Sequence, residues 1–185
     1  MMIAALFVER YGTYWDHPGI DPWDERRDAR RYPGPHPVIA HPPCARWGRY
    51  ARGMPGNQRF SVGDDGGCFE SALASAHKWG GVIEHPRDSK AWKHYGYLTP
   101  PHDGGWVSAG WLGGWTCCTD QGNYGHRARK ATWLLYFGPL PHPLKWGDSG
   151  KQVLVESMGE KERAATPDAF KSQLYRLALK SRGIA

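Results

Sequence analysis

The run Val38–Ala40 constrains the fold of this chain most, because it is an apolar stretch of strand type that ends abruptly. His41 and two prolines follow it, and proline rings fix φ and hold the preceding residue in extended geometry. Cys44 comes directly after the prolines. Because ligands bind at the carboxyl ends of strands in open α/β sheets, this pattern predicts a thiol facing a ligand at such an edge.

Other apolar runs predict strands at residues 2–8, 81–84 and 131–137, and a strand or hairpin within 106–118. The first run is expected to be a strand rather than a signal peptide, since it lacks a basic leader and a cleavage site. The order of strands, loops and helices predicts an α/β sheet with some antiparallel pairing near the C-terminus.

Three segments have helical character. Apolar residues recur at helical spacing in residues 68–76, and a pair of glycines shortly afterwards would end a helix. A helix is also predicted at 166–180, with Thr166 as N-cap, and a short one at 21–29, where a proline and acidic residues open the segment. Residues 46–65 lack periodicity and are predicted to be a long functional loop.

Length and composition bound the architecture. The 185 residues are expected to form one α/β domain of catalytic type at 1–150 and a C-terminal helical extension at 151–185. No apolar run approaches the roughly 20 residues that span a bilayer, so no membrane partner is expected. The adjacent Cys117 and Cys118 fit no simple disulfide framework, so reduced thiols in a cytoplasm are expected.

Positive charge is concentrated around Cys44. The chain carries a formal net charge of +6, and residues 29–63 contain no Asp or Glu. The arginines of this segment are Arg30, Arg31, Arg46, Arg49, Arg52 and Arg59. A basic stripe around a candidate site predicts a polyanionic partner, most often nucleic acid, although a merely solvated surface has the same composition.

Polar residues follow or precede three of the predicted strands. The first segment is His41-Pro42-Pro43-Cys44, the second is Glu84-His85-Pro86, and the third runs from Gln121 to Trp133. A cysteine nucleophile acts as a thiolate, and nearby arginines would lower its pKa. A glutamate at a neighbouring strand end would donate a proton to the ring that the thiolate attacks, or hold that ring.

In this order the three segments resemble the cytosine carbon-5 DNA methyltransferases, especially phage-encoded members. Pro42-Pro43-Cys44 is similar to the family's Pro-Cys nucleophile motif, and Glu84-His85-Pro86 to its Glu-Asn-Val or Glu-Asn-Pro motif, with histidine in place of asparagine. Residues 124–132 are similar to the Tyr-Gly…Arg-Lys-x-Thr segment of many phage members. The resemblance covers roughly residues 38–137.

The resemblance implies a reduced class I methyltransferase-like (Rossmann-type) sheet with long loops and a C-terminal helix. Cys44 would attack carbon-6 of a flipped-out pyrimidine in DNA, while Glu84 contacts the ring nitrogen and the exocyclic amine. Arg127 or Arg129 would contact the base or its phosphate, and the spacing does not decide which of the two arginines matches the family's arginine. The residues expected to be catalytic are Cys44, Glu84 and Arg129. The residues expected to bind nucleic acid are His41, Arg46, Trp47, Arg49, Arg52, Arg59, His85, Gln121, Tyr124, His126, Arg127 and Lys130.

The methyl donor that the resemblance implies is S-adenosylmethionine. The family has a glycine-rich turn after its first strand, but residues 9–15 of this chain hold a single glycine. Asp21, Asp24 and Tyr11 are the cofactor-binding candidates, with an aspartate standing in for the acidic residue that binds the ribose. The chain after Gly138 is too short for the usual target-recognition domain, so a minimal or altered member is expected, which reads little sequence, uses another cofactor or has lost catalysis.

Other interpretations of the same residues stay open. Cys44 has the character of a small buried hydrophobe as well as that of a nucleophile. No Cys-x-x-Cys or His-Glu-x-x-His pattern occurs, so no metal is expected. Two alternatives stay open: zinc on Cys117, Cys118 and His126 or on Cys44 with His41, and iron on His41, His85 and His126 with an Asp or Glu as partner. A second function class is a non-catalytic nucleic-acid-binding protein on the same scaffold, with a phage accessory or anti-restriction role.

Overall fold

A computed structural model describes residues 1–53 and 56–182. Its centre is a seven-stranded sheet with the strand order β2-β1-β3-β4-β7-β6-β5. The strands are β1 (Ile3–Leu6), β2 (Ile20–Trp23), β3 (Val38–Ala40), β4 (Gly81–Pro86), β5 (Val107–Ser108), β6 (Trp115–Asp120) and β7 (Ala131–Phe137). Strands β1 to β4 are parallel, whereas the pairs β4–β7, β7–β6 and β6–β5 are antiparallel. The predicted α/β sheet with antiparallel pairing toward the C-terminus is therefore confirmed.

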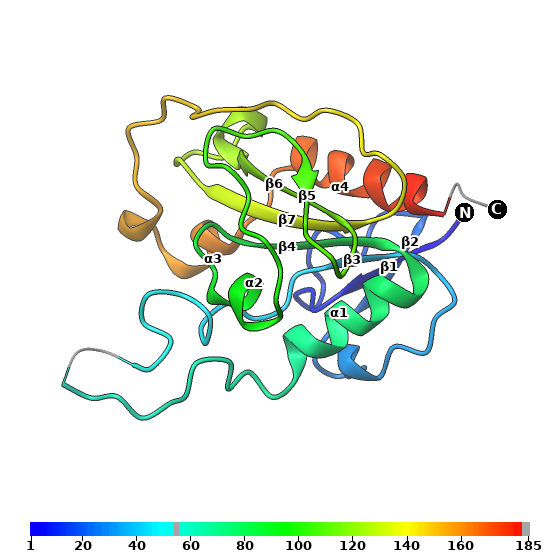
Figure 1. The fold of residues 1–185 in the computed structure, drawn as a ribbon, viewed down its shortest axis with the longest axis horizontal. Coiled ribbons are helices and arrows are strands. Elements are labelled where there is room, and N and C mark those ends of the chain that lie inside the picture. Colours follow the sequence, from blue (N-terminus) through cyan, green and yellow to red (C-terminus); the bar gives the residue numbers. More distant parts are fainter. Residues whose placement is uncertain (54–55, 183–185) are drawn as a thin grey trace.

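Helices cover both faces of this sheet (Figure 1). α1 (Cys68–Trp79) packs on one face and α4 (Asp168–Ser181) on the other, and we call these the α1 face and the α4 face. Because strand side chains alternate, Ile83 joins the core under α1 while Ile39 and Val82 join the core under α4. The shorter elements are the 3-10 turns η1 (Ala29–Arg31), η2 (Gln121–Tyr124) and η3 (Val155–Ser157) and the helices α2 (Lys90–His94) and α3 (Glu160–Ala164).

The chain reverses its course across the sheet at β1. It passes from β1 to β2 on one side and then returns to β3 on the other side of β1. Such a reversal leaves a crevice outside the carboxyl ends of the two strands, and ligands of open α/β sheets bind there. The loops that follow β1 and β3 therefore lie where the fold favours a binding site.

Most of the predicted elements are confirmed, but the helix predicted at residues 21–29 is wrong. Residues 20–23 form β2 instead, and Pro22 is tolerated because β2 is an edge strand that needs ladder hydrogen bonds on one side only. Helix α4 begins after Pro167 rather than after the predicted cap Thr166. Helices α2 and α3 were not predicted, because each is only five residues long and carries no clear apolar period.

The predicted loop at residues 46–65 is irregular throughout its described part and projects from the body of the molecule in Figure 1. Residues 54–55 of this loop, and residues 183–185 of the predicted C-terminal extension, lie outside the described residues. No helix in the described part of the chain is long and apolar enough to cross a bilayer.

Candidate functional site

Five polar side chains form a hydrogen-bonded chain on the α4 face of the sheet. His41 Nδ1 lies 2.9 Å from Glu84 Oε2, and His41 Nε2 lies 2.8 Å from the Tyr14 hydroxyl. Gln121 Nε2 donates to Glu84 Oε1 at 3.1 Å and to Thr132 Oγ1 at 2.9 Å. We call Tyr14, His41, Glu84, Gln121 and Thr132 the His41–Glu84 network.

The strand register brings this network together. His41 directly follows β3, and Glu84 lies near the end of β4, the parallel neighbour of β3. Across the antiparallel pair Glu84 faces Leu134, so Thr132 stands two residues further along on the same face. Gln121 directly follows β6, whose last residue pairs with the first residue of β7. Residues more than 40 positions apart in the chain thus share one sheet edge.

Glu84 is a buried carboxylate that stays charged. Burial alone would raise its pKa, but the His41 hydrogen bond and then the charge of Lys130 bring the pKa below its ordinary value. An ionised Glu84 can only accept, so His41 Nδ1 donates to it and His41 Nε2 accepts from Tyr14. Burial, and then the charge of Glu84, raise the pKa of Tyr14, which keeps its hydroxyl a donor. The network therefore holds one negative charge and fixes the His41 tautomer.

Cys44 lies four residues after β3, on the same edge as Glu84. Its side chain is exposed, yet the protein around the sulfur desolvates it enough to raise the pKa of the thiol, and the charge of Glu84 raises it further. The cations that oppose this effect are Lys130 and Arg163. The expectation that arginines of the neighbouring loop lower the Cys44 pKa is therefore wrong. Cys44 rests as a thiol, and a base is needed to make it a nucleophile.

His85 is buried on the α1 face of the sheet. Its Nδ1 lies 2.7 Å from Ser89 Oγ, and its ring packs on Phe69 with centroids 5.3 Å apart. Burial lowers the pKa of His85 to about 4, against weaker upward effects of Glu84 and of the Pro42 and Pro43 carbonyls. His85 is fully enclosed, so its side chain is out of reach of a nucleic acid on the surface.

The basic loop after Cys44 presents arginines to solvent, but Trp47 does not join them. Arg46 stacks on Phe60 with 3.3 Å between the guanidinium carbon and the ring centroid. Arg49, Arg52 and Arg59 are exposed. Trp47 is fully buried, donates from its indole nitrogen to Asp65 at 2.8 Å, and anchors the loop to the core. The large apolar ring of Trp47 is worth more in the core than at a polar surface, and this overrides its place in a basic sequence.

Some residues of the segment from Gln121 to Trp133 belong to the His41–Glu84 network, and others lie outside it. Gln121 belongs to the network, whereas the buried Tyr124 accepts a hydrogen bond from the Lys145 backbone at 2.7 Å and packs on Phe170. Lys130 Nζ donates to the carbonyls of residues 164 and 165, which end α3. Burial lowers the pKa of Lys130, and the charge of Glu84 opposes that change.

The two candidate arginines of this segment lie in surface ion pairs. Arg127 pairs with Glu162 and Arg129 with Asp148, each at 2.6 Å. None of the hydrogen bonds or ion pairs among residues 1–53 and 56–182 joins Arg129 to Cys44 or to the network. His126 is buried, and its Nδ1 lies within 3.1 Å of both the carbonyl and the N–H of residue 128.

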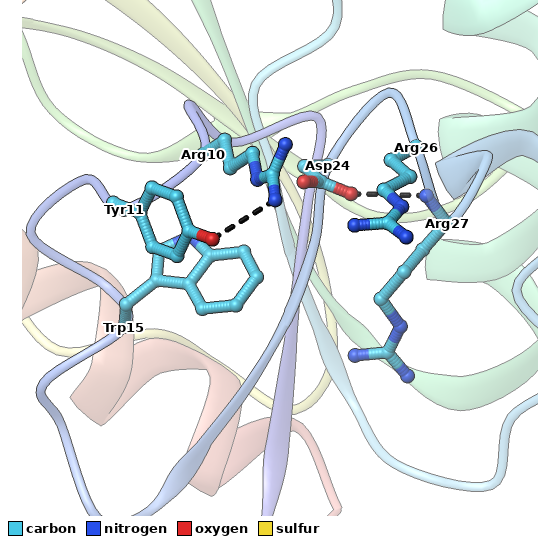
Figure 2. Close-up of a pocket in the computed structure, with 6 residues that line it drawn as sticks. All are labelled: Arg10, Tyr11, Trp15, Asp24, Arg26 and Arg27. Atoms are coloured by element: carbon cyan, nitrogen blue, oxygen red, sulfur yellow. Dashed lines mark hydrogen bonds between the residues drawn. The ribbon is translucent and has the colours of Figure 1, made fainter.

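A pocket of about 320 Å³ opens at the carboxyl ends of β1 and β2 (Figure 2). Its wall consists of Arg10, Tyr11, Trp15, Asp24, Arg26 and Arg27. Two of the three cofactor-binding candidates, Tyr11 and Asp24, therefore line one pocket. Asp21 lies outside this wall and is occupied by hydrogen bonds from Trp23 Nε1 at 2.8 Å and from Arg27 at 2.6 Å.

Several residues of these sites carried no usable signal in the sequence. Tyr14 lies in an irregular loop, and Arg163 lies beyond any recognised motif; only the fold brings them to His41 and to Cys44. Thr132 ends the segment 124–132, and nothing in the sequence indicates its hydrogen bond with Gln121. Among the described residues no cluster of three or more His, Cys, Asp or Glu side chains is arranged to hold a metal ion, and all four cysteines are free.

Comparison of this chain with protein-family models, with curated proteins and with solved structures finds no match.

Proposed function

We propose that this protein modifies pyrimidine bases, cytosine first among them, through a covalent adduct between Cys44 and carbon-6 of the ring. The observation that carries the proposal is the meeting of Cys44 and a charged Glu84 at the ends of adjacent parallel strands, close enough for the Glu84 charge to raise the pKa of the thiol. The reversal of the chain at β1, with β2 on one side and β3 on the other, supports a Rossmann-type sheet of the class I methyltransferase kind.

The adduct forms without an outside acid or base. Glu84 takes the thiol proton from Cys44, and the sulfur electron pair forms the bond to carbon-6. The electrons of the carbon-5–carbon-6 double bond shift toward the ring nitrogen N3, which receives the proton from Glu84. His41 and Gln121 hold the two Glu84 oxygens in place throughout. Carbon-5 is then an enamine carbon and can attack an electrophile.

The basic loop suits DNA as the substrate. Exposed arginines at 49, 52 and 59 begin five residues after Cys44, and Arg46 stacks on an aromatic ring beside them. Arginines bind phosphates and stack on bases, and a flipped base needs its backbone held. A steep fall of DNA affinity with salt is expected. We place this chemistry in a cytoplasm, where the free thiol at Cys44 would stay reduced.

The pocket at the ends of β1 and β2 fits only half of S-adenosylmethionine, the donor that the resemblance implies. Asp24 can accept hydrogen bonds from ribose hydroxyls, and Trp15 offers a flat ring. The sulfonium cation, however, would lie in a wall where the guanidinium groups of Arg10 and Arg26 have no ion-pair partner among the described residues. Like charges at such distances repel, so we assign no step to this donor.

Tritium release from carbon-5 tests the proposal without any donor. Protonation of the enamine carbon by solvent and reversal of the adduct would release tritium from DNA labelled at carbon-5 of cytosine. We expect release by the native protein and none by Cys44→Ser, with Cys68→Ser as the matched control. Absence of release by the native protein would overturn the proposal.

A second candidate is a nucleic-acid-binding protein that performs no chemistry. The raised Cys44 pKa and the surface position of Arg129 favour it. DNA retention that is equal in the native protein and Cys44→Ser, together with no tritium release, is its expected signature.

A further inference from the structure

The pocket at the ends of β1 and β2 has groups that no part of the Cys44 chemistry uses. It lies beyond the carboxyl ends of β1 and β2, and the side chains in Figure 2 surround a common space. Its volume of about 320 Å³ is at the small end of the roughly 300–1,000 Å³ range of ligand pockets. That size fits one nucleotide better than a dinucleotide.

Asp24 contributes a buried carboxylate with a free acceptor. The residue is 4% exposed, and its Oδ1 accepts from the Arg27 backbone N–H at 2.9 Å. No hydrogen bond to Oδ2 comes from residues 1–53 or 56–182. Asp24 lines the pocket, so this oxygen is open to a hydrogen-bond donor of a ligand. The hydroxyl groups of a ribose are donors that an acidic residue after such a strand commonly binds.

The arginines of the wall differ in how far they are already engaged. Arg27 donates to Asp21 and to the Pro22 carbonyl, and it stacks on Trp23 with 4.0 Å to the ring centroid. Arg10 donates to the Tyr11 hydroxyl at 2.9 Å, which is a neutral partner. Arg26 makes no ion pair or side-chain hydrogen bond with any described residue. Two guanidinium groups therefore face the pocket without an acidic partner of their own.

Flat rings complete the wall. Trp15 and Tyr11 lie with centroids 5.5 Å apart, and Trp15 is fixed by a hydrogen bond from its indole nitrogen to the Glu9 carbonyl at 3.0 Å. A fixed, partly exposed indole is a surface on which a purine or pyrimidine can stack. The indole of Trp15, the carboxylate of Asp24 and two guanidinium groups without acidic partners thus line one cavity.

We infer that this pocket binds a ribonucleotide, with its phosphate on Arg10 and Arg26, its ribose hydroxyls on Asp24 and its base against Trp15. The phosphate distinguishes this ligand from the cationic donor that the resemblance implies, because two unpaired guanidinium groups attract an anion and repel a sulfonium. The inference stands apart from the proposed function, since binding of a nucleotide requires neither Cys44 nor the His41–Glu84 network.

Titration calorimetry of the full chain with AMP, adenosine and S-adenosylmethionine tests this inference. We expect AMP to bind at least about tenfold more tightly than adenosine, because each charge-assisted contact contributes on the order of a tenfold gain. Arg26→Gln should reduce the AMP affinity about tenfold and leave the adenosine affinity unchanged. The matched control Arg31→Gln removes the same charge from an exposed arginine outside the pocket and should leave both affinities unchanged.

Three results would overturn the inference. The first is equal affinity for AMP and adenosine, and the second is an equal effect of Arg26→Gln and Arg31→Gln on AMP. The third is tighter binding of S-adenosylmethionine than of AMP, which would make the pocket a site for a cationic donor. Each result is independent of tritium release, so failure here leaves the Cys44 proposal separately testable.

Discussion

The two faces of the sheet treat neighbouring residues of one strand in opposite ways. Glu84 and His85 are adjacent in β4 and buried to a similar degree, but they point to different faces. On the α4 face, His41, Gln121 and the charge of Lys130 keep Glu84 ionised. On the α1 face, burial among aromatic rings keeps His85 neutral, with a pKa of about 4.

Partners rather than depth decide which buried group keeps its charge. The α4 face supplies hydrogen bonds to both carboxylate oxygens of Glu84, from His41 and from Gln121. The α1 face supplies Phe69 and Trp92 around His85, and the imidazole Nε2 has no hydrogen-bond partner among the described residues. The α4 face therefore holds a charged carboxylate and the α1 face a neutral imidazole.

The largest expected effect is on the α1 face, from Trp92→Ala. Trp92 is fully buried, packs on Phe69 and Trp133, and donates to Thr116 Oγ1 at 2.9 Å. Removing it should lower the free energy of unfolding by about 3–5 kcal/mol, measured by urea denaturation. Trp111→Ala, at a position that is 88% exposed, should change it by less than about 0.5 kcal/mol. Similar losses in the two variants would contradict an aromatic core under α1.

The next largest effect is a pH dependence that His85 adds to stability. In the unfolded chain His85 takes up a proton below about pH 6.5, whereas in the folded protein it does so only near pH 4. The unfolded state binds more protons between these values, so stability falls as the pH falls through this window, by about 3 kcal/mol in all. His85→Asn should flatten the curve of unfolding free energy against pH from 6.5 to 4. An unchanged slope would show that another group carries the dependence.

Glu84 changes the free energy of unfolding in a lower pH range than His85 does. Its pKa is lowered on folding, so its stabilising effect is complete above the unfolded value of about 4.3 and is lost as the pH falls below it. His85→Asn should leave that lower part of the curve in place. The contributions of His85 and Glu84 to stability would then be distinguished by the pH range in which each is lost.

The sequence was sufficient for the strands that carry the site and insufficient for the contacts between them. Val38–Ala40 and the run before Pro86 were predictable, because buried parallel strands are continuous apolar runs. Helix 21–29 failed because edge strands admit proline, and the pattern Asp-Pro-Trp-Asp opens a helix equally well. The pairing of Tyr14 with His41 depends on the course of a loop, which local sequence does not determine.

A smaller effect is expected at Cys44 from Glu84→Gln. Removing the negative charge takes away one of the two causes that raise the thiol pKa, so the pKa should fall. The rate of Cys44 alkylation by iodoacetamide at neutral pH should then rise several-fold, measured for the Cys44 peptide by mass spectrometry. Glu70→Gln, on the exposed side of α1, is the matched control and should leave the rate unchanged. Equal rates in all three proteins would mean that Glu84 and Cys44 are not coupled.

The smallest effect tests whether the α4 face works as one network. Tyr14→Phe removes only the hydroxyl that donates to His41 Nε2, and it should lower the unfolding free energy by about 1 kcal/mol, whereas Tyr50→Phe at an exposed position should have no effect. If Tyr14 acts through His41, the losses in Tyr14→Phe and His41→Asn should not add in the double variant. Strict additivity would reduce the network to independent pairs. It would also remove the contrast between the connected side chains of the α4 face and His85 of the α1 face, whose Nε2 has no hydrogen-bond partner among the described residues.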